Sequence, residues 1–134
     1  MATTTGFELS ERRDYLRAVV RGRPQRATMI ELFAAVEELI AAREQSRVLL
    51  DKSDMDSALL TVPDIRAIAD ACSEALRRGT RIAVYATSPA VFGLSRMTQA
   101  FAADAGAINV FSDEESALRW LLDSDAGDGP PPAA

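Results

Sequence analysis

Acidic and hydroxyl side chains gather directly after the apolar segment 47–50. Asp51, Asp54 and Asp56 follow it, with Ser53 and Ser57 between them. Carboxylates can accept a phosphoryl group, hold a divalent cation or carry out acid–base chemistry, and a hydroxyl can be phosphorylated. The aspartates lack the spacing and the glycine of a calcium-binding loop. The sequence therefore predicts no metal site, no cofactor and no catalytic residue, and leaves Asp51 and Ser53 as candidate contacts to a ligand or partner.

The composition narrows the chemistry further. The 134-residue chain contains no histidine, so it lacks the commonest general base and zinc ligand. Its single cysteine, Cys72, allows no intrachain disulfide and fits a reducing compartment. A net charge of -5 disfavours bulk attraction to nucleic acid or an anionic membrane. With no apolar signal segment and no membrane-length run, we expect a cytoplasmic protein without a nucleic-acid partner or membrane insertion.

Two periodicities of apolar residues alternate along the chain and predict its elements. Strands are expected over 7–10, 15–22, 47–50, 81–86 and 107–111, and helices over 28–45, 62–79, 88–106 and 113–123. The order β-β-α-β-α-β-α-β-α predicts an α/β fold with a mixed, mainly parallel five-stranded sheet flanked by helices. We expect one domain over 1–123, followed by a flexible tail rich in proline, glycine and alanine over 124–134.

Several helix starts carry capping signals. The pairs with capping-box spacing are Thr28 with Glu31, Thr61 with Asp64, and Ser112 with Glu115. Ser88 is expected to cap the helix that opens with Pro89. Open α/β sheets bind ligands beyond the carboxyl ends of their strands. Because Thr87 and Ser88 follow the strand 81–86, they join the candidate contacts to a ligand or partner.

The predicted helix 88–106 carries more apolar residues than one buried stripe needs. Val91, Leu94, Met97 and Phe101 form the stripe, and Phe92 lies roughly 100° from Val91 around the helix. Core packing is the simpler interpretation, because methionine and phenylalanine usually fill cores. The alternative is that Phe92 and Met97 line an apolar ligand pocket or contact a partner, including a second copy of the chain.

Arginines concentrate near the N-terminus of this acidic chain. They are Arg12, Arg13, Arg17, Arg21, Arg23 and Arg26. On a strand, Arg13, Arg17 and Arg21 would share one face. One interpretation is protection of an edge strand against aggregation. The other is an anion-facing patch for an acidic partner, and a single interleaved aromatic residue, Tyr15, argues against nucleic acid.

The stretch VLLDKSDMD at 48–56 resembles the phosphoacceptor strand of response-regulator receivers. That resemblance makes Asp51 the phosphorylated residue and Thr87 the hydroxyl residue after the next strand. Receivers also carry an acidic pair after the first strand, which holds Mg²⁺, and a lysine at the end of the last strand. Those places here read FELSERRDY and VFSDEE, which lack that electrostatic support for phosphoryl transfer.

Three longer stretches carry a second resemblance. They are RVLLD at 47–51, RRGTRIAVYATSPAVFGLSRM at 77–97 and INVFSDEESALRWLL at 108–122. Together with the element order, they resemble STAS domains, the fold of bacterial anti-sigma-factor antagonists, and most closely their SpoIIAA-like (STAS/SEC14-like) branch. The antagonists are phosphorylated on a serine in a D-S-x-G context, at the start of the helix after the central strand. The resemblance implies two candidate phosphoacceptors, Ser57 by its preceding aspartate and Thr61 by its position, although no glycine follows Ser57 as required.

Three functions remain open at this point. The first is a non-catalytic STAS-like binding or regulatory module that takes a protein partner, a second copy of the chain or a small apolar ligand. The second is a phosphoacceptor signalling domain that uses Asp51, or Ser57 or Thr61. The third is an enzyme that uses carboxylates alone, which is disfavoured because no apolar wall is evident that would shift a pKa. We expect the first.

Overall fold

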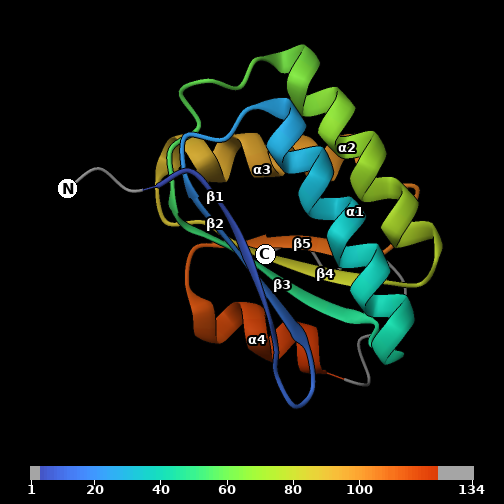
Figure 1. Cartoon of the computed structure of the whole chain (residues 1–134). Helices are drawn as coiled ribbons and strands as arrows, with labels where there is room; N and C mark the ends of the chain where they lie inside the picture. The colour runs from blue at the N-terminus through green and yellow to red at the C-terminus, as the bar shows by residue number, and fades with distance from the viewer. Residues whose placement is uncertain (1–3, 124–134) are drawn as a thin grey trace.

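The computed structural model of the protein, which describes residues 4–123, has a five-stranded sheet and four helices (Figure 1). In chain order the elements are β1 (Gly6–Glu11), β2 (Leu16–Gly22), α1 (Arg26–Arg43), β3 (Arg47–Met55), α2 (Val62–Arg77), β4 (Arg81–Tyr85), α3 (Pro89–Ala102), β5 (Ile108–Phe111) and α4 (Glu114–Leu122). The predicted tail, 124–134, lies outside the described residues. None of the helices within 4–123 has both the length and the apolar character that crossing a membrane requires.

The strands lie in the sheet in the order in which they occur in the chain. β1 pairs with β2 in antiparallel orientation, and every later neighbour pairs in parallel. The predicted α/β class, element order and mixed, mainly parallel sheet are therefore confirmed. Each parallel pair is joined by a crossover helix, as parallel pairing requires.

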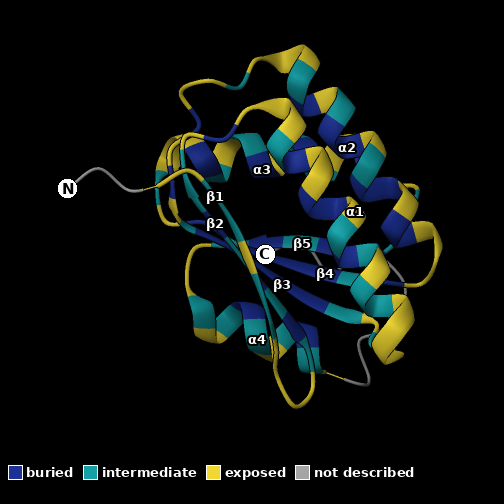
Figure 2. Ribbon diagram, in the orientation of Figure 1, coloured by how far each residue is buried: buried dark blue, intermediate teal, exposed yellow. Residues whose placement is uncertain are grey.

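Helices α1, α2 and α3 cover one face of the sheet, and α4 covers the other (Figure 1). Because neighbouring strand residues point to opposite faces, β3 contributes to two cores. Val48 and Leu50 join the main core beneath the three helices, whereas Leu49 joins a smaller cluster with Ala117 and Leu121 of α4. Figure 2 shows the buried middle of β3 and β4 between these layers. Burial on both faces explains the near-continuous apolar runs of these strands.

β3 runs well past its apolar segment and ends only at Met55. The expected end of this strand at residue 50 is therefore wrong, because residues 51–55 also lie on the strand. The pairing with β2 shifts here, because Val19 pairs with Asp51 but Arg21 pairs with Asp54. One more residue of β3 than of β2 lies between these two pairs, so the register shifts by one residue, as it does at a β-bulge. Backbone pairing thus continues through a stretch whose side chains have already become polar.

Two predicted helix caps are confirmed. The Thr61 hydroxyl accepts a hydrogen bond from the Asp64 amide at 3.4 Å, and the Asp64 carboxylate accepts one from the Thr61 amide at 2.9 Å. Ser88 caps α3 by accepting from the Val91 amide at 3.2 Å. These side chains satisfy amides that the first turn of a helix leaves without a partner.

Two other predicted caps are wrong. Helix α1 begins earlier than predicted, after the N-cap Gln25, whose side chain makes no capping hydrogen bond. Thr28 therefore lies inside the first turn. At α4 the cap is Asp113 rather than Ser112, and its carboxylate accepts from the Ser116 amide at 2.8 Å. Aspartate and serine are about equally good caps, so the pattern alone could not choose between adjacent residues.

The arginines of β2 protect no edge, because β2 lies between β1 and β3 and the edge strand is β1. The edge-protection interpretation is therefore wrong for Arg17 and Arg21. The anion-facing patch is also largely neutralised. Arg17 pairs with Asp51 at 2.6 Å, and Arg21 pairs with Glu8 at 3.0 Å.

Candidate functional site

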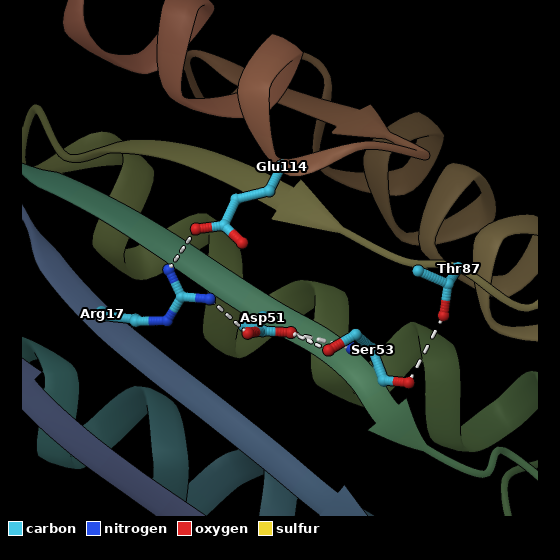
Figure 3. A network of polar contacts seen from close by, with 5 residues as sticks. All are labelled: Arg17, Asp51, Ser53, Thr87 and Glu114. Atoms are coloured by element: carbon cyan, nitrogen blue, oxygen red, sulfur yellow. Dashed lines mark hydrogen bonds and ion pairs between the residues drawn. The ribbon is translucent and has the colours of Figure 1, made fainter.

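A network of polar side chains surrounds Asp51 on the α4 face of the sheet (Figure 3). Arg17 Nη2 donates to Asp51 Oδ2 at 2.6 Å, and Arg17 Nη1 donates to Glu114 Oε1 at 3.0 Å. The other oxygen, Asp51 Oδ1, accepts from the Ser53 amide at 2.9 Å and from the Ser53 hydroxyl at 2.6 Å. Thr87 Oγ1 donates to the Ser53 carbonyl at 3.3 Å. The network joins β2, β3, the segment after β4 and the first turn of α4.

The sheet register brings these groups together. Asp51 pairs with Val19, and Arg17 lies two residues before Val19 and therefore on the same face of β2. Ser53 lies two residues after Asp51 and also faces α4. Glu114 opens α4, where a carboxylate is favoured by the positive end of the helix dipole. Alternation along β2 and β3 thus aligns Arg17 with Asp51, and the first turn of α4 adds Glu114.

The buried carboxylate of Asp51 is compensated by the guanidinium group of Arg17. Asp51 is only 5% exposed, and both of its oxygens have partners. Burial acts to lower the pKa of Arg17, but its hydrogen bonds to Glu114 and Asp51 outweigh burial and raise that pKa above its usual value. Phosphorylation of Asp51 would require the release of one oxygen from these partners. These contacts therefore connect the sheet to the start of α4.

The three aspartates of the DKSDMD stretch do not converge. Asp54 is exposed on the last part of β3. Asp56 lies beyond the strand, pairs with Arg23 at 3.0 Å and accepts from the Ala58 amide at 2.9 Å. Across residues 4–123, no three or more cysteine, aspartate or glutamate side chains gather as metal ligands would. A divalent cation needs several converging oxygens, which this stretch does not present.

Lys52 directly follows Asp51 on β3. Its side chain points away from α4, to the face of the sheet that α1, α2 and α3 cover, and is buried there. Lys52 is the only lysine in the chain. Lys52 is 6% exposed, and its Nζ donates to the Ser95 hydroxyl of α3 at 3.2 Å. Burial lowers the pKa of Lys52 to about 8, and burial raises the pKa of the Cys72 thiol on α2 to about 12.

The sequence interpretation overlooked Lys52 and Ser95. A signal was present, because side chains alternate along a strand. If Asp51 faces α4, Lys52 must face the three-helix layer. The isolated serine in the helix stretch FGLSRM then falls at a position that a buried amine can reach.

The candidate contacts from the sequence fall into separate groups. Asp51, Ser53 and Thr87 belong to one network. Ser88 serves as the N-cap of α3. Phe92 and Met97 are partly buried and pack against the main core on the other side of the sheet. The structure therefore brings only the first three together.

The two candidate hydroxyls near α2 differ in exposure. Ser57 is buried, and its carbonyl accepts from the Leu60 amide within a turn. Thr61 is exposed and caps α2. Leu59 and Val62 flank Thr61 with 47% and 53% of their surface exposed. An accessible hydroxyl between two accessible apolar side chains is the more open part of this region.

Comparison with known proteins agrees with this architecture. One similar structure is an anti-sigma factor antagonist from Mycobacterium paratuberculosis, with a TM-score of 0.62 and 17% identity over 91% of this chain and 96% of that one. Another is an uncharacterised protein with a SpoIIAA-like fold from Shewanella loihica PV-4, with a TM-score of 0.59 and 17% identity over 90% of this chain and 94% of that one. These identities show the shared fold alone.

The sequence itself carries the family assignment. No curated protein matches it. A family model described as SpoIIAA-like matches residues 15–122, which include α1 to α4 and all strands but β1. Because that match spans most of the chain, the protein belongs to the SpoIIAA-like family, as its resemblance to that branch predicts.

Proposed function

We propose that this chain is a non-catalytic regulatory module that binds a protein partner through the start of α2. One observation carries the proposal, namely the exposure of Leu59 and Val62. They are the two most exposed large apolar side chains within residues 4–123. Single exposed apolar residues are common on protein surfaces. These two, however, flank the cap of α2 beyond the carboxyl end of β3, where open α/β sheets place their binding surfaces.

The exposed surface continues from α2 to α3. Arg66 lies one helical turn after Val62. Its guanidinium carbon stands 4.3 Å from the centre of the Phe101 ring on α3, and Phe101 is itself exposed. Leu59, Val62, Arg66 and Phe101 are called the α2–α3 face below. Arginine and phenylalanine are among the residue types that are enriched in protein interfaces.

The polar network around Asp51 supports a role without turnover. Its carboxylate is committed to Arg17 and Ser53, so it is not poised as a nucleophile or base. One protein of similar fold is described as an anti-sigma factor antagonist. A binding role therefore uses what is exposed on this chain and leaves the internal network intact.

The test is a comparison of two surface variants. The double variant Leu59→Ser with Val62→Ser removes the exposed apolar groups, and Ile30→Ser removes a similarly exposed side chain from α1 as the matched control. Each tagged protein is incubated with native lysate, and the recovered proteins are quantified. We expect one partner in stoichiometric amount with the wild type and Ile30→Ser, and its loss with the double variant. If all three proteins recover the same lysate proteins in equal amounts, the proposal that the α2–α3 face binds a partner is wrong.

A second copy of the chain is distinguished by mass. Light scattering during gel filtration measures the mass of each variant without lysate. A dimeric wild type that becomes monomeric in the Leu59→Ser, Val62→Ser variant identifies the partner as another copy. A dimer that persists in that variant places self-association elsewhere.

A phosphorylation switch at Thr61 is a second candidate function. The specific observation is that Thr61 is exposed at the N-terminus of α2, where the helix dipole favours a phosphate. Its hydroxyl also donates to Asp64 at 2.9 Å, so phosphorylation would replace that bond with repulsion between like charges. Phosphorylation would thus alter the α2–α3 face directly. Intact-mass analysis of protein from its native cell should show one added phosphoryl group that is absent from Thr61→Ala, and an unmodified mass under all growth conditions would reject the switch.

A further inference from the structure

A cleft of about 220 Å³ lies between the β1–β2 turn and the C-terminal end of α1. In Figure 1 these two segments lie at the lower end of the molecule, away from the start of α2. Tyr15, Leu16 and Leu39 supply the apolar part of its lining. The cleft is therefore separate from both the α2–α3 face and the network around Asp51.

The charged groups that line this cleft are unevenly matched. Arg43 of α1 reaches across to Glu11 of β1, with Nε 2.8 Å from Oε1, so these two charges neutralise each other. Arg12 and Arg13 also line the cleft, and within residues 4–123 neither forms an ion pair. The Arg12 amide donates to the Tyr15 carbonyl at 2.9 Å, which holds the turn that carries both arginines. Two uncompensated guanidinium groups thus stand beside an apolar wall.

Two nearby features oppose an anion and must be weighed against those charges. The C-terminal end of α1 carries about half a negative charge from its free carbonyls. The amides of Glu44 and Gln45 reduce that effect, because both bond the Ile40 carbonyl. The exposed carboxylates of Asp14 and Glu44 lie near the cleft in sequence but do not line it. Two full positive charges at the lining therefore outweigh the partial charge of the helix end.

We infer that this cleft binds a small organic anion. A carboxylate or phosphate group would lie against Arg12 and Arg13, whose planar guanidinium groups can each donate two parallel hydrogen bonds. A short apolar body would lie against Tyr15, Leu16 and Leu39. The volume suits such a ligand, because about 220 Å³ lies below the roughly 300–1,000 Å³ typical of pockets for drug-sized molecules.

The test is an NMR titration of the full-length chain with four probes. Hexanoate and phenyl phosphate each combine an anionic group with an apolar body. Inorganic phosphate supplies the charge alone, and hexanamide supplies the apolar body alone. We expect saturable shifts of the cleft amides, including those of Arg12, Tyr15 and Gln45, with at least one of the organic anions. The arm with the higher affinity identifies the acidic group as carboxylate or phosphate.

Variants then locate the binding. Arg12→Gln with Arg13→Gln should weaken the affinity about tenfold or more, as expected when charge-assisted hydrogen bonds are lost. Arg96→Gln is the matched control, because Arg96 is exposed on α3 and also forms no ion pair within residues 4–123. Three results would overturn the proposal. They are equal shifts with hexanamide, equal binding of inorganic phosphate, and unchanged affinity in the Arg12, Arg13 variant.

Discussion

Two adjacent residues of β3 place opposite charges on opposite faces of the sheet, and the fold treats them differently. Asp51 faces α4, where Arg17 and Ser53 occupy both of its oxygens. Lys52 faces α2 and α3, where the Ser95 hydroxyl accepts its hydrogen bond. Both side chains are buried. One face thus compensates a buried charge with an opposite charge, and the other offers a neutral acceptor.

The difference predicts opposite consequences for stability. Removing one member of a buried ion pair leaves the other charge without compensation and is strongly destabilising. Replacing a buried, poorly compensated charge with an apolar group removes a desolvation cost. The charge of Asp51 should therefore raise the free energy of unfolding, whereas the charge of Lys52 should lower it. The following predictions begin with the largest expected effect.

Breaking the compensated face should have the largest effect. Asp51→Asn removes the carboxylate that Arg17 binds at 2.6 Å and should lower the free energy of unfolding by about 3 kcal/mol, as expected for the loss of a buried hydrogen bond between charged groups while Arg17 keeps its pair with Glu114. Urea denaturation followed by circular dichroism measures this change. Glu8→Gln breaks the exposed pair with Arg21 and should cost below about 0.5 kcal/mol. Similar losses in both variants would show that burial does not distinguish the two pairs.

Removing the charge on the other face should have the opposite sign. Lys52→Met should raise the free energy of unfolding at pH 7 by on the order of 2–3 kcal/mol, because burial lowers the pKa of Lys52 from 10.5 to about 8. Below pH 8 the lysine is protonated in both the folded and unfolded chains, so the full cost is present. Between pH 8 and 10.5 the unfolded chain binds more protons, so the stability contributed by Lys52 rises with pH. The advantage of Lys52→Met should therefore shrink over this window.

The thiol of Cys72 has the opposite pH dependence and must be controlled. Burial raises its pKa from 9 to about 12, so its contribution to stability is full below pH 9 and declines as the pH rises towards 12. Comparing Lys52→Met with the parent in a Cys72→Ala background removes this opposing trend. A stability difference that stays constant from pH 7 to pH 10.5 in that background would contradict the assignment to Lys52.

The hydrogen bond between Lys52 and Ser95 provides a finer test. Ser95→Ala removes the acceptor at 3.2 Å and should cost about 1–2 kcal/mol in the parent protein, as expected for a bond to a charged donor. In the Lys52→Met background the same change should cost close to nothing, because the hydroxyl no longer has that partner. A double-mutant cycle by urea denaturation measures the coupling. Equal losses in both backgrounds would mean that Ser95 acts through packing alone.

The elements of the fold could be predicted from the sequence, but the polar network around Asp51 could not. Apolar periodicity identified every strand and helix, because a buried stripe or alternating face leaves a local pattern. It could not predict the extent of β3, since backbone pairing continues after the side chains become polar. The network around Asp51 joins residues separated by 34 and 97 positions. Such contacts depend on how the elements are placed against one another and leave no local pattern.

The local signals that did succeed were those confined to a few residues. The Thr61–Asp64 box and the Ser88 cap each lie within one helical turn, and both were predicted. The same reasoning failed at α4, where Ser112 and Asp113 are both good caps in neighbouring positions. Choosing between them requires knowing where the chain leaves β5. The burial of Lys52 could have been inferred from alternation along β3, once Asp51 was assigned to the other face.

The start of each helix extends the comparison to the smallest expected effect. On the three-helix face, Thr61→Ala should cost about 1 kcal/mol, because the capping hydrogen bonds at the start of α2 are lost. On the α4 face, Ser112→Ala should have no measurable effect, and Asp113→Ala should cost about 1 kcal/mol, because Asp113 is the residue that caps α4. Thermal unfolding of the three variants under identical conditions measures the differences. Equal destabilisation by Ser112→Ala and Asp113→Ala would contradict this assignment. It would show that Ser112 also caps α4, as its spacing from Glu115 predicts, beside the ion pair between Arg17 and Glu114 in the first turn.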